Sequence, residues 1–325
     1  MKIKKEKYSF SKQEIEILKQ IVTENLALSQ IRERLSIKPN LLSHYIKDLQ
    51  QKQIIRIGQE LRSEENAVNS RKNVGYQDNK HSLMLKELLM RYSQVKWENV
   101  LSGLGLDVLF QIATGSDSLK ESMSLVTFWR YSRNLMALGI VAYNDEKLQI
   151  NDRFSLLKDF LDEYQAFIIR NLVASVSSNA VLLWQKDSEC LIRVPKLAQI
   201  DRKGFVKTAT SRLQDFGIQL TSDFDVYFYS KGKREIHLED VILHMLLIEK
   251  ENVRYNTYCL LLLKKYLSQI DENYLMNKAI WYDLNLQINA MLEFLKTKGI
   301  RTGQGLPTWN EFGAKMREYE IEAVA

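Results

Sequence analysis

The chain has 325 residues, 45% of them hydrophobic and 26% charged, which excludes a disordered protein and is enough for two or three globular domains. Its apolar runs are far shorter than the ~20 residues of a membrane span, and its lysine-rich start lacks the apolar segment of a secretory signal. Cys190 and Cys259 stand apart in apolar stretches, which predicts reduced core residues. We therefore expect a cytoplasmic protein that does not bind a membrane.

The excess of positive charge lies at the beginning of the chain. Residues 1–75 contain 15 Lys and Arg against nine Asp and Glu, and this excess of six equals the formal net charge of the whole protein. The other 250 residues hold 31 residues of each sign. Positive charge gathered in one segment is typical of a region that binds a polyanion such as DNA.

Three short helices and a strand are predicted close to the N-terminus. Ser11 and Glu14 can form a capping box for the first helix, residues 29–35 fit the second, and Pro39 suits the first turn of the third. The β-branched run "IIRI" (residues 54–57) then favours a strand. Helix, helix, turn, helix and strand is the order of a winged helix-turn-helix domain.

The third helix has two different sides. In and just before the stretch "LLSHYIKDLQQKQIIRI" (residues 41–57), apolar residues recur at i, i+3, i+4 and i+7, namely Leu42, Tyr45, Ile46 and Leu49. At the same spacing the other side carries short hydrogen-bonding side chains and one cation, namely Asn40, Ser43, His44 and Lys47. Such residues contact base edges and phosphates, whereas an ordinary solvated face mixes Glu and Lys. The pattern favours a DNA-reading helix, with plain polar surface as the alternative.

Over about residues 8–76 the sequence resembles the winged helix-turn-helix regulators of the MarR and ArsR type. In that family the third helix enters the major groove and the wing contacts the flanking backbone. The resemblance implies that the third helix presents to DNA the side chains of Lys38, Asn40, Ser43, His44 and Lys47. It implies wing contacts from Arg56, Arg62, Arg71 and Lys72. The polar stretch "RSEENAVNSRKN" delays the return strand, so the wing departs from the family pattern and its contacts are less defined.

A second copy of the pattern is predicted at about residues 97–152. The stretch "WRYSRNLMALGIVAY" (residues 129–143) aligns without a gap with the third helix and strand, and a hairpin turning at Asn144-Asp145 follows. Few residues are identical, so coincidence is the alternative. Residues 96–150 hold five basic and six acidic residues, and the helix carries Phe128 and Trp129. A neutral copy with aromatic side chains favours a protein-interaction face over phosphate binding.

The second half of the chain is predicted to be a mixed α/β unit that ends in a helical bundle. We expect a long helix at 154–173, a hairpin turning at Lys186-Asp187-Ser188, a helix near 203–216 and a strand in "FDVYFYS". Helices follow near 239–250, 254–268, 271–282, 284–297 and 309–319. The expected class is therefore mainly α with small β elements (α+β). The expected domains are residues 1–76, a linker or connecting helix at 77–96, residues 97–173 and residues 174–325.

No catalytic residue, metal or cofactor is predicted. Asp223 and Asp225 resemble the Asp-x-Asp of nucleotidyltransferases, but the Gly-Ser turn that the family needs upstream is missing. His237 and His244 lack the third and fourth ligands of a zinc site. The glycines of "GQGLP" (residues 303–307) follow no strand, which argues against a phosphate loop.

The expected function is a transcriptional regulator that binds double-stranded DNA as a homodimer, with a C-terminal half for a partner or ligand. Aromatic anchors for the dimer would come from Phe128, Trp129, Tyr164 and Phe167, unless these side chains pack inside the monomer. The architecture also resembles antitoxins of the AbiEi type, which implies an autorepressor whose C-terminal domain binds a toxin. That likeness involves no diagnostic motif. An enzymatic C-terminal half is the third alternative.

Overall fold

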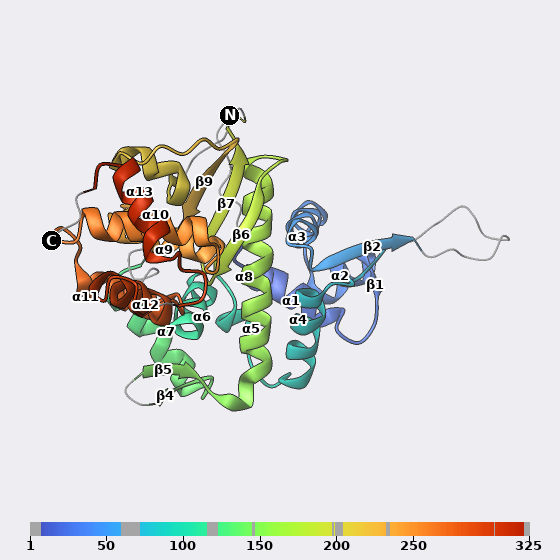
Figure 1. Cartoon of the computed structure of the whole chain (residues 1–325). Helices are drawn as coiled ribbons and strands as arrows, with labels where there is room; N and C mark the ends of the chain where they lie inside the picture. The colour runs from blue at the N-terminus through green and yellow to red at the C-terminus, as the bar shows by residue number, and fades with distance from the viewer. Residues whose placement is uncertain are drawn as a thin grey trace. The chain divides into compact units, whose positions relative to one another are not determined.

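The computed structural model describes residues 8–59, 72–115, 123–144, 147–196, 198, 204–231, 235–301 and 303–321. Over these residues the chain is mainly helical with three small β-sheets, which confirms the expected α+β class. None of the helices in these ranges is both long enough and apolar enough to cross a membrane. The chain divides into two compact units, unit 1 (Met1–Ile168) and unit 2 (Ile169–Ala325), each traced in Figure 1.

Unit 1 begins with the elements expected of a winged helix. In chain order they are α1 (Lys12–Gln20), β1 (Leu26–Ala27), α2 (Leu28–Leu35), α3 (Pro39–Gln51), β2 (Ile55–Gln59) and β3 (Lys72–Tyr76). The strands form an antiparallel sheet of order β1-β3-β2. The predicted capping box starts α1, since Ser11 Oγ accepts the Glu14 N–H at 3.2 Å and the Glu14 carboxylate accepts the Ser11 N–H at 2.6 Å. Pro39 occupies the first turn of α3, as predicted.

The second part of unit 1 repeats helix, helix and hairpin. Its elements are α4 (Lys80–Arg91), α5 (Trp97–Val100), α6 (Leu104–Thr114), α7 (Leu125–Ala137), β4 (Val141–Asn144), β5 (Lys147–Ile150) and the 3-10 helix η3 (Asp152–Phe154). The helix α8 (Ser155–Val176) begins in unit 1 and ends in unit 2. β4 and β5 pair antiparallel from Val141 opposite Ile150 to Asn144 opposite Lys147. The hairpin is thus present where it was predicted, while Asp145 of the expected turn lies outside the described residues.

One continuous hydrophobic core fills unit 1. Ile31 of α2 and Leu49 of α3 belong to the same buried cluster as Leu88 of α4 and Trp97 of α5. Residues 77–96, expected as a linker or connecting helix, therefore include a helix with a buried face. The sequence-based boundaries subdivide a segment that packs around one core, because the apolar side of α4 is covered by the elements on either side of it in the chain.

Unit 2 contains a four-stranded antiparallel sheet of order β6-β7-β9-β8. The strands are β6 (Val181–Lys186), β7 (Glu189–Pro195), β8 (Phe205–Lys207) and β9 (Phe224–Tyr229). The hairpin β6-β7 turns at Asp187, whose φ of 52° is the left-handed conformation of a tight turn. Ile192 and Tyr227 belong to the cluster that includes Ile169 of α8, whereas Leu191 and Phe228 belong to the cluster of the C-terminal helices.

The C-terminal elements largely follow the prediction. They are the 3-10 helix η4 (Ala209–Phe216), α9 (Leu238–Ile248), α10 (Val253–Lys265), α11 (Glu272–Trp281), α12 (Asn285–Lys296) and α13 (Trp309–Glu318). The helix expected near 203–216 is present only in its second part, as the 3-10 helix η4, because Phe205–Lys207 form β8. Gly204 has a φ of 85°, and Phe205 pairs with Tyr229 at the sheet edge. Pairing across the chain thus overrides the local helical pattern.

Both cysteines are buried free thiols, as predicted. Burial, together with the neighbouring Glu189 carboxylate, raises the pKa of Cys190 to about 12. Burial also raises the pKa of Cys259 well above the usual range of a thiol. At neutral pH both side chains are therefore protonated core residues of low nucleophilicity.

Candidate nucleic-acid interface

The side chains expected to read DNA lie together on the exposed side of α3. Asn40, Ser43, His44 and Lys47 are all exposed, whereas the apolar stripe on the opposite side is buried. Because these four positions recur at i, i+3, i+4 and i+7, they share one face of the helix. The structure therefore brings this part of the predicted site together on a surface that a ligand can reach.

Among the residues that the structure describes, the polar side chains of this face interact with their own helix. Asn40 Oδ1 accepts the Leu41 N–H at 3.0 Å, and the Ser43 hydroxyl donates to the Pro39 carbonyl at 3.0 Å. His44 Nε2 lies 3.3 Å from the Asp48 carboxylate. These short-range contacts can be exchanged for contacts with a ligand without disturbing the packing of α3.

Lys38 stands at the start of α3. It is the N-cap residue, it is exposed, and its backbone is extended with φ −64° and ψ 142°, as expected of a residue before proline. The backbone of the first turn has few N–H groups to offer, because Pro39 has none and those of Leu41 and Leu42 are already bonded. The positive charge at this end of α3 is therefore that of the exposed Lys38 side chain, which is suited to a phosphate.

The described residues that were expected to form wing contacts do not share a face. Arg56 on β2 and Lys72 on β3 are both exposed. Arg56 pairs with Gly75 in the sheet, whereas Lys72 stands two residues from the buried Val74. Since side chains alternate between the two faces of a strand, Arg56 and Lys72 lie on opposite faces of this hairpin. The other predicted wing residues, Arg62 and Arg71, lie outside the described residues.

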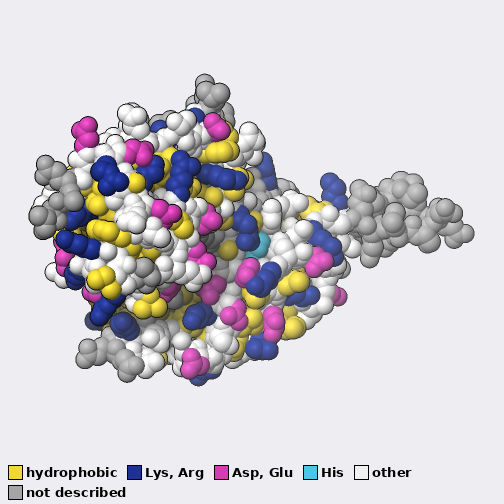
Figure 2. All heavy atoms as spheres, in the orientation of Figure 1, with side chains coloured by type: hydrophobic (Ala, Val, Ile, Leu, Met, Phe, Trp, Pro, Cys, Tyr) yellow, Lys and Arg dark blue, Asp and Glu magenta, His cyan; other side chains and the backbone are white. Residues whose placement is uncertain are grey.

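Several basic residues of the N-terminal segment are engaged in ion pairs. Lys19 bonds to Glu98 at 2.8 Å, and Arg34 lies 3.3 Å from Glu24. Partial burial opposes protonation of Lys19, but the bond to Glu98 raises its pKa overall. Cations without an ion pair to any described residue remain exposed, namely Lys12, Arg32, Lys38, Lys47, Arg56 and Lys72. On the face shown in Figure 2, basic and acidic side chains are intermingled.

A buried ion pair fixes the end of α3. Lys52 is the C-cap residue of α3, and its ammonium group binds the carboxylate of Glu14 at the start of α1. Both residues are almost completely buried, and the Lys52 Nζ lies 5.5 Å from the centroid of the Phe10 ring. The sequence showed Glu14 only as a capping residue and gave Lys52 no role, because their pairing depends on the tertiary fold.

Side chains at the start of α4 hold the turn that follows α3. Asn79 Nδ2 donates to the Gln53 carbonyl at 2.7 Å, and the Ser82 hydroxyl donates to the Ile54 carbonyl at 2.6 Å. His81 Nε2 lies 3.1 Å from the Lys52 carbonyl oxygen. Three successive carbonyl groups beyond α3 thus have side-chain partners. The end of α3 is therefore held by side chains at the start of α4.

Two of the aromatic side chains expected at a dimer interface are internal. Tyr164 and Phe167 are buried, and their rings stack at a centroid distance of 5.8 Å. The Tyr164 hydroxyl donates to the Tyr8 carbonyl at 2.7 Å, and His81 stacks on Phe167 at 4.4 Å. The proposed anchoring role of Tyr164 and Phe167 was therefore wrong, since α8 uses them to close the core of unit 1.

Three of the four residues considered for other chemistry are engaged in structural contacts. Asp225 is buried and its carboxylate binds Lys207 Nζ at 2.7 Å, while Asp223 is exposed just before β9. His237 is the N-cap residue of α9, and the buried His244 stacks on the ring of Phe228 in β9. No group of three or more potential metal-binding side chains occurs within the described part of the chain.

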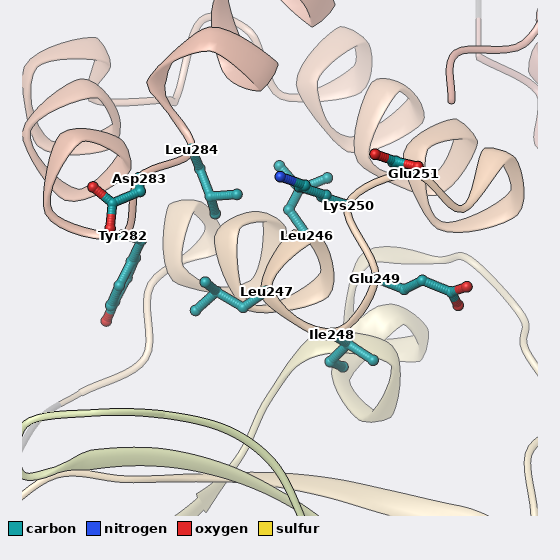
Figure 3. A pocket seen from close by; sticks show the side chains of 9 residues that line it. All are labelled: Leu246, Leu247, Ile248, Glu249, Lys250, Glu251, Tyr282, Asp283 and Leu284. Atoms are coloured by element: carbon teal, nitrogen blue, oxygen red, sulfur yellow. The ribbon is translucent and has the colours of Figure 1, made fainter. Parts of the chain in front are cut away.

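A hollow in unit 2 lies between the end of α9 and the turn joining α11 to α12 (Figure 3). It has a volume of about 500 Å³, and Leu246, Tyr282 and Leu284 contribute apolar lining. In Figure 3 the amine of Lys250 reaches toward Leu284, whereas the carboxylate of Glu249 points away from it. A small ligand of unit 2 would find both apolar walls and one cation here.

Comparison with known proteins concerns only the C-terminal part. The model of a protein family described as HVO_2833_C, C-terminal, matches residues 202–321. This segment lies within unit 2 and includes β8, β9 and the helices α9 to α13. No curated protein and no solved structure matches the chain. The family match therefore marks the C-terminal segment as a domain found in other proteins, and its description names no activity.

Proposed function

We propose that this protein is a cytoplasmic transcriptional regulator that binds double-stranded DNA in a sequence-specific manner through the winged helix at its N-terminus. The exposed polar face of α3 carries the proposal. Asn40, Ser43 and His44 are suited to base edges, and Lys38 and Lys47 to phosphates. Unit 2 would serve a partner or ligand of the regulator.

The character of the face supports DNA contact over ordinary solvation. A solvated helix usually alternates acidic and basic side chains along its exposed side. On α3 the acidic residue is Asp48, which lies beside His44 at the edge of the face and is only half-exposed. Lys47 forms no ion pair with the described residues, so its charge remains available to a phosphate. The buried ion pair between Lys52 and Glu14 fixes the end of α3. This reduces the loss of conformational entropy when the helix binds DNA.

Replacing Lys47 by alanine is expected to weaken binding to all DNA sequences alike. One lost phosphate contact lowers the slope of log affinity against log salt by roughly one unit. Asn40→Ala is expected to relax base preference instead, by about 1–3 kcal/mol at one position of the site. Fluorescence anisotropy with the full-length chain, on a site selected from random duplexes, measures both effects.

Lys96→Ala provides the matched control, because Lys96 is exposed in unit 1 but stands in the neutral segment. Its affinity and salt slope are expected to equal those of the wild type. Equal effects of Lys96→Ala and Lys47→Ala would contradict a specific role for α3. Point variants are preferable to deleting residues 1–76, since deletion would expose the core that this segment shares with α4 and α5.

The second winged helix is expected to contribute little to phosphate binding. Its segment is close to neutral, with five basic and six acidic residues, so the double variant Arg130→Glu/Arg133→Glu should change the affinity for nonspecific DNA by no more than about threefold at physiological salt. Titration of a random duplex measures this. A loss of two orders of magnitude would show that both winged helices bind DNA.

We further propose that the regulator acts as a homodimer. A single winged helix with few free cations binds weakly, with dissociation constants on the order of 10⁻⁴–10⁻⁶ M. Two half-sites about one helical turn apart would provide specificity. Sedimentation equilibrium at micromolar concentration is expected to give twice the chain mass of 38.0 kDa. A monomer, together with a selected site lacking an inverted repeat, would rule out the dimer.

A further inference from the structure

A second exposed face, on α7, differs chemically from the face of α3. Val126 is 80% exposed, Leu125 64% and Trp129 40%, while Ser132 and Leu135 on the other side of the helix are buried. We name the exposed set of Leu125, Val126, Trp129, Arg130 and Arg133 the α7 face. Neighbouring large apolar side chains with this exposure are characteristic of an interaction surface.

Two cations border the apolar part of the α7 face. Arg130 and Arg133 are exposed on the same side of the helix, and α7 contains no acidic residue. Neither arginine forms an ion pair with another residue that the structure describes. The Arg130 guanidinium lies 5.5 Å from the ring centroid of Tyr131. The face therefore offers apolar contact and two available positive charges in one strip.

The α7 helix of a second copy does not fit this face. A symmetric contact between two α7 helices would gather four arginine side chains with no acidic residue from either helix, and like charges across an interface are repulsive. Duplex DNA does not fit either, because Leu125 and Val126 would present bulky apolar groups without contributing phosphate contacts. The two arginines call for a partner with acidic side chains. The exposed Leu125, Val126 and Trp129 require that the same partner also present apolar side chains.

We infer that the α7 face binds an acidic amphipathic helix of a partner protein. Leu125, Trp129 and Arg133 recur every four residues and form one ridge, against which the ridge of a second helix can pack. The partner's aliphatic side chains would cover Leu125, Val126 and Trp129. Its carboxylates would bind Arg130 and Arg133, whose forked donors suit carboxylate groups.

Fluorescence anisotropy with the full-length protein tests this inference. The probe is a labelled synthetic helix of Leu, Ala and Glu, about 15–20 residues long, with leucines at i, i+3, i+4 and i+7. Saturable binding is expected, whereas a scrambled peptide of equal composition is expected not to bind. Leu125→Ser/Val126→Ser should weaken binding at least about tenfold, as should Arg130→Gln/Arg133→Gln. The arginine variant should also remove most of the salt dependence.

Leu286→Ser is the control variant, because Leu286 is 79% exposed but lies on α12. It should bind the peptide as the wild type does. The inference would be overturned if the helical peptide did not bind, or if the scrambled peptide bound equally well. It would also be overturned if the α7 variants bound the helical peptide as tightly as the wild type. A second experiment measures binding to vesicles of phosphatidylserine and phosphatidylcholine. If the protein bound these vesicles through the α7 face but did not bind the peptide, the ligand would be a lipid surface and the inference would be wrong. Duplex affinity measured on the same variants separates this result from the proposed DNA binding.

Discussion

Lys52→Met is expected to lower the free energy of unfolding of unit 1 by about 3–5 kcal/mol. The substitution removes one partner of a buried ion pair and leaves the Glu14 carboxylate in the core without its cation. Methionine preserves most of the apolar stem, so the effect comes mainly from the unpaired charge. Native-state hydrogen exchange of amides in α1 and α3 reports on this unit and measures the change.

Two further variants make this prediction specific. Lys19→Met breaks the partly exposed pair with Glu98 and should cost no more than about 1 kcal/mol. Glu14→Gln combined with Lys52→Met removes both charges and keeps an acceptor for the Ser11 N–H, so most of the lost stability should return. If the double variant were as unstable as Lys52→Met alone, loss of packing and not the unpaired carboxylate would be the cause.

Gly305→Ala is expected to destabilise unit 2 by about 2–5 kcal/mol. Gly305 has a φ of 75°, where a side chain costs about 1–2 kcal/mol. A Cβ atom would also lie 2.7 Å from the carbonyl oxygen of Glu251 and 2.8 Å from its Cα, which forces the backbone to shift. Hydrogen exchange in α10 measures the loss. The Asn256 amide, which donates to the Gly305 carbonyl at 2.8 Å and to that of Lys250 at 3.0 Å, would be disturbed as well.

Gly217→Ala separates the two contributions within the same unit. Gly217 has a φ of 76°, but the atom nearest to a Cβ would be Lys265 Nζ at 3.0 Å, the end of a flexible side chain that donates an exposed hydrogen bond to the Phe216 carbonyl. Because this side chain can shift without moving the backbone, Gly217→Ala should show mainly the conformational cost, about 1–2 kcal/mol. Equal losses at Gly217 and Gly305 would contradict the role assigned to the close approach of Glu251.

Local patterns predicted the helices well because their signals lie within a few residues. Ser11 with Glu14 and Thr308 with Glu311 form the capping boxes read from the sequence, and Pro39 starts α3. The exposed face of α3 also followed from spacing alone. In each case the partners are close in the chain, so no tertiary information was needed.

Features that depend on distant partners escaped prediction. Lys52 meets Glu14 across 38 residues, and Ser82 reaches the Ile54 carbonyl across 28. Phe205 joins a strand only because Tyr229 lies opposite. A hydrophilic residue such as Lys52 is ordinarily assigned to the surface, and only the fold shows that its charge is compensated inside. The same holds for Tyr164, an aromatic residue equally compatible with a core and an interface.

The short-range contacts of the α3 face have a consequence for how this protein can evolve. Within the described part of the chain, Asn40, Ser43 and His44 bond to residues of their own helix, while the buried stripe of α3 and the Lys52–Glu14 pair attach that helix to the core. Mutations at these exposed positions should therefore change the stability of the fold very little, so selection for stability hardly restricts them. On the proposed function, descendants of this chain could change their target sequences through three or four substitutions, with the scaffold inherited unaltered.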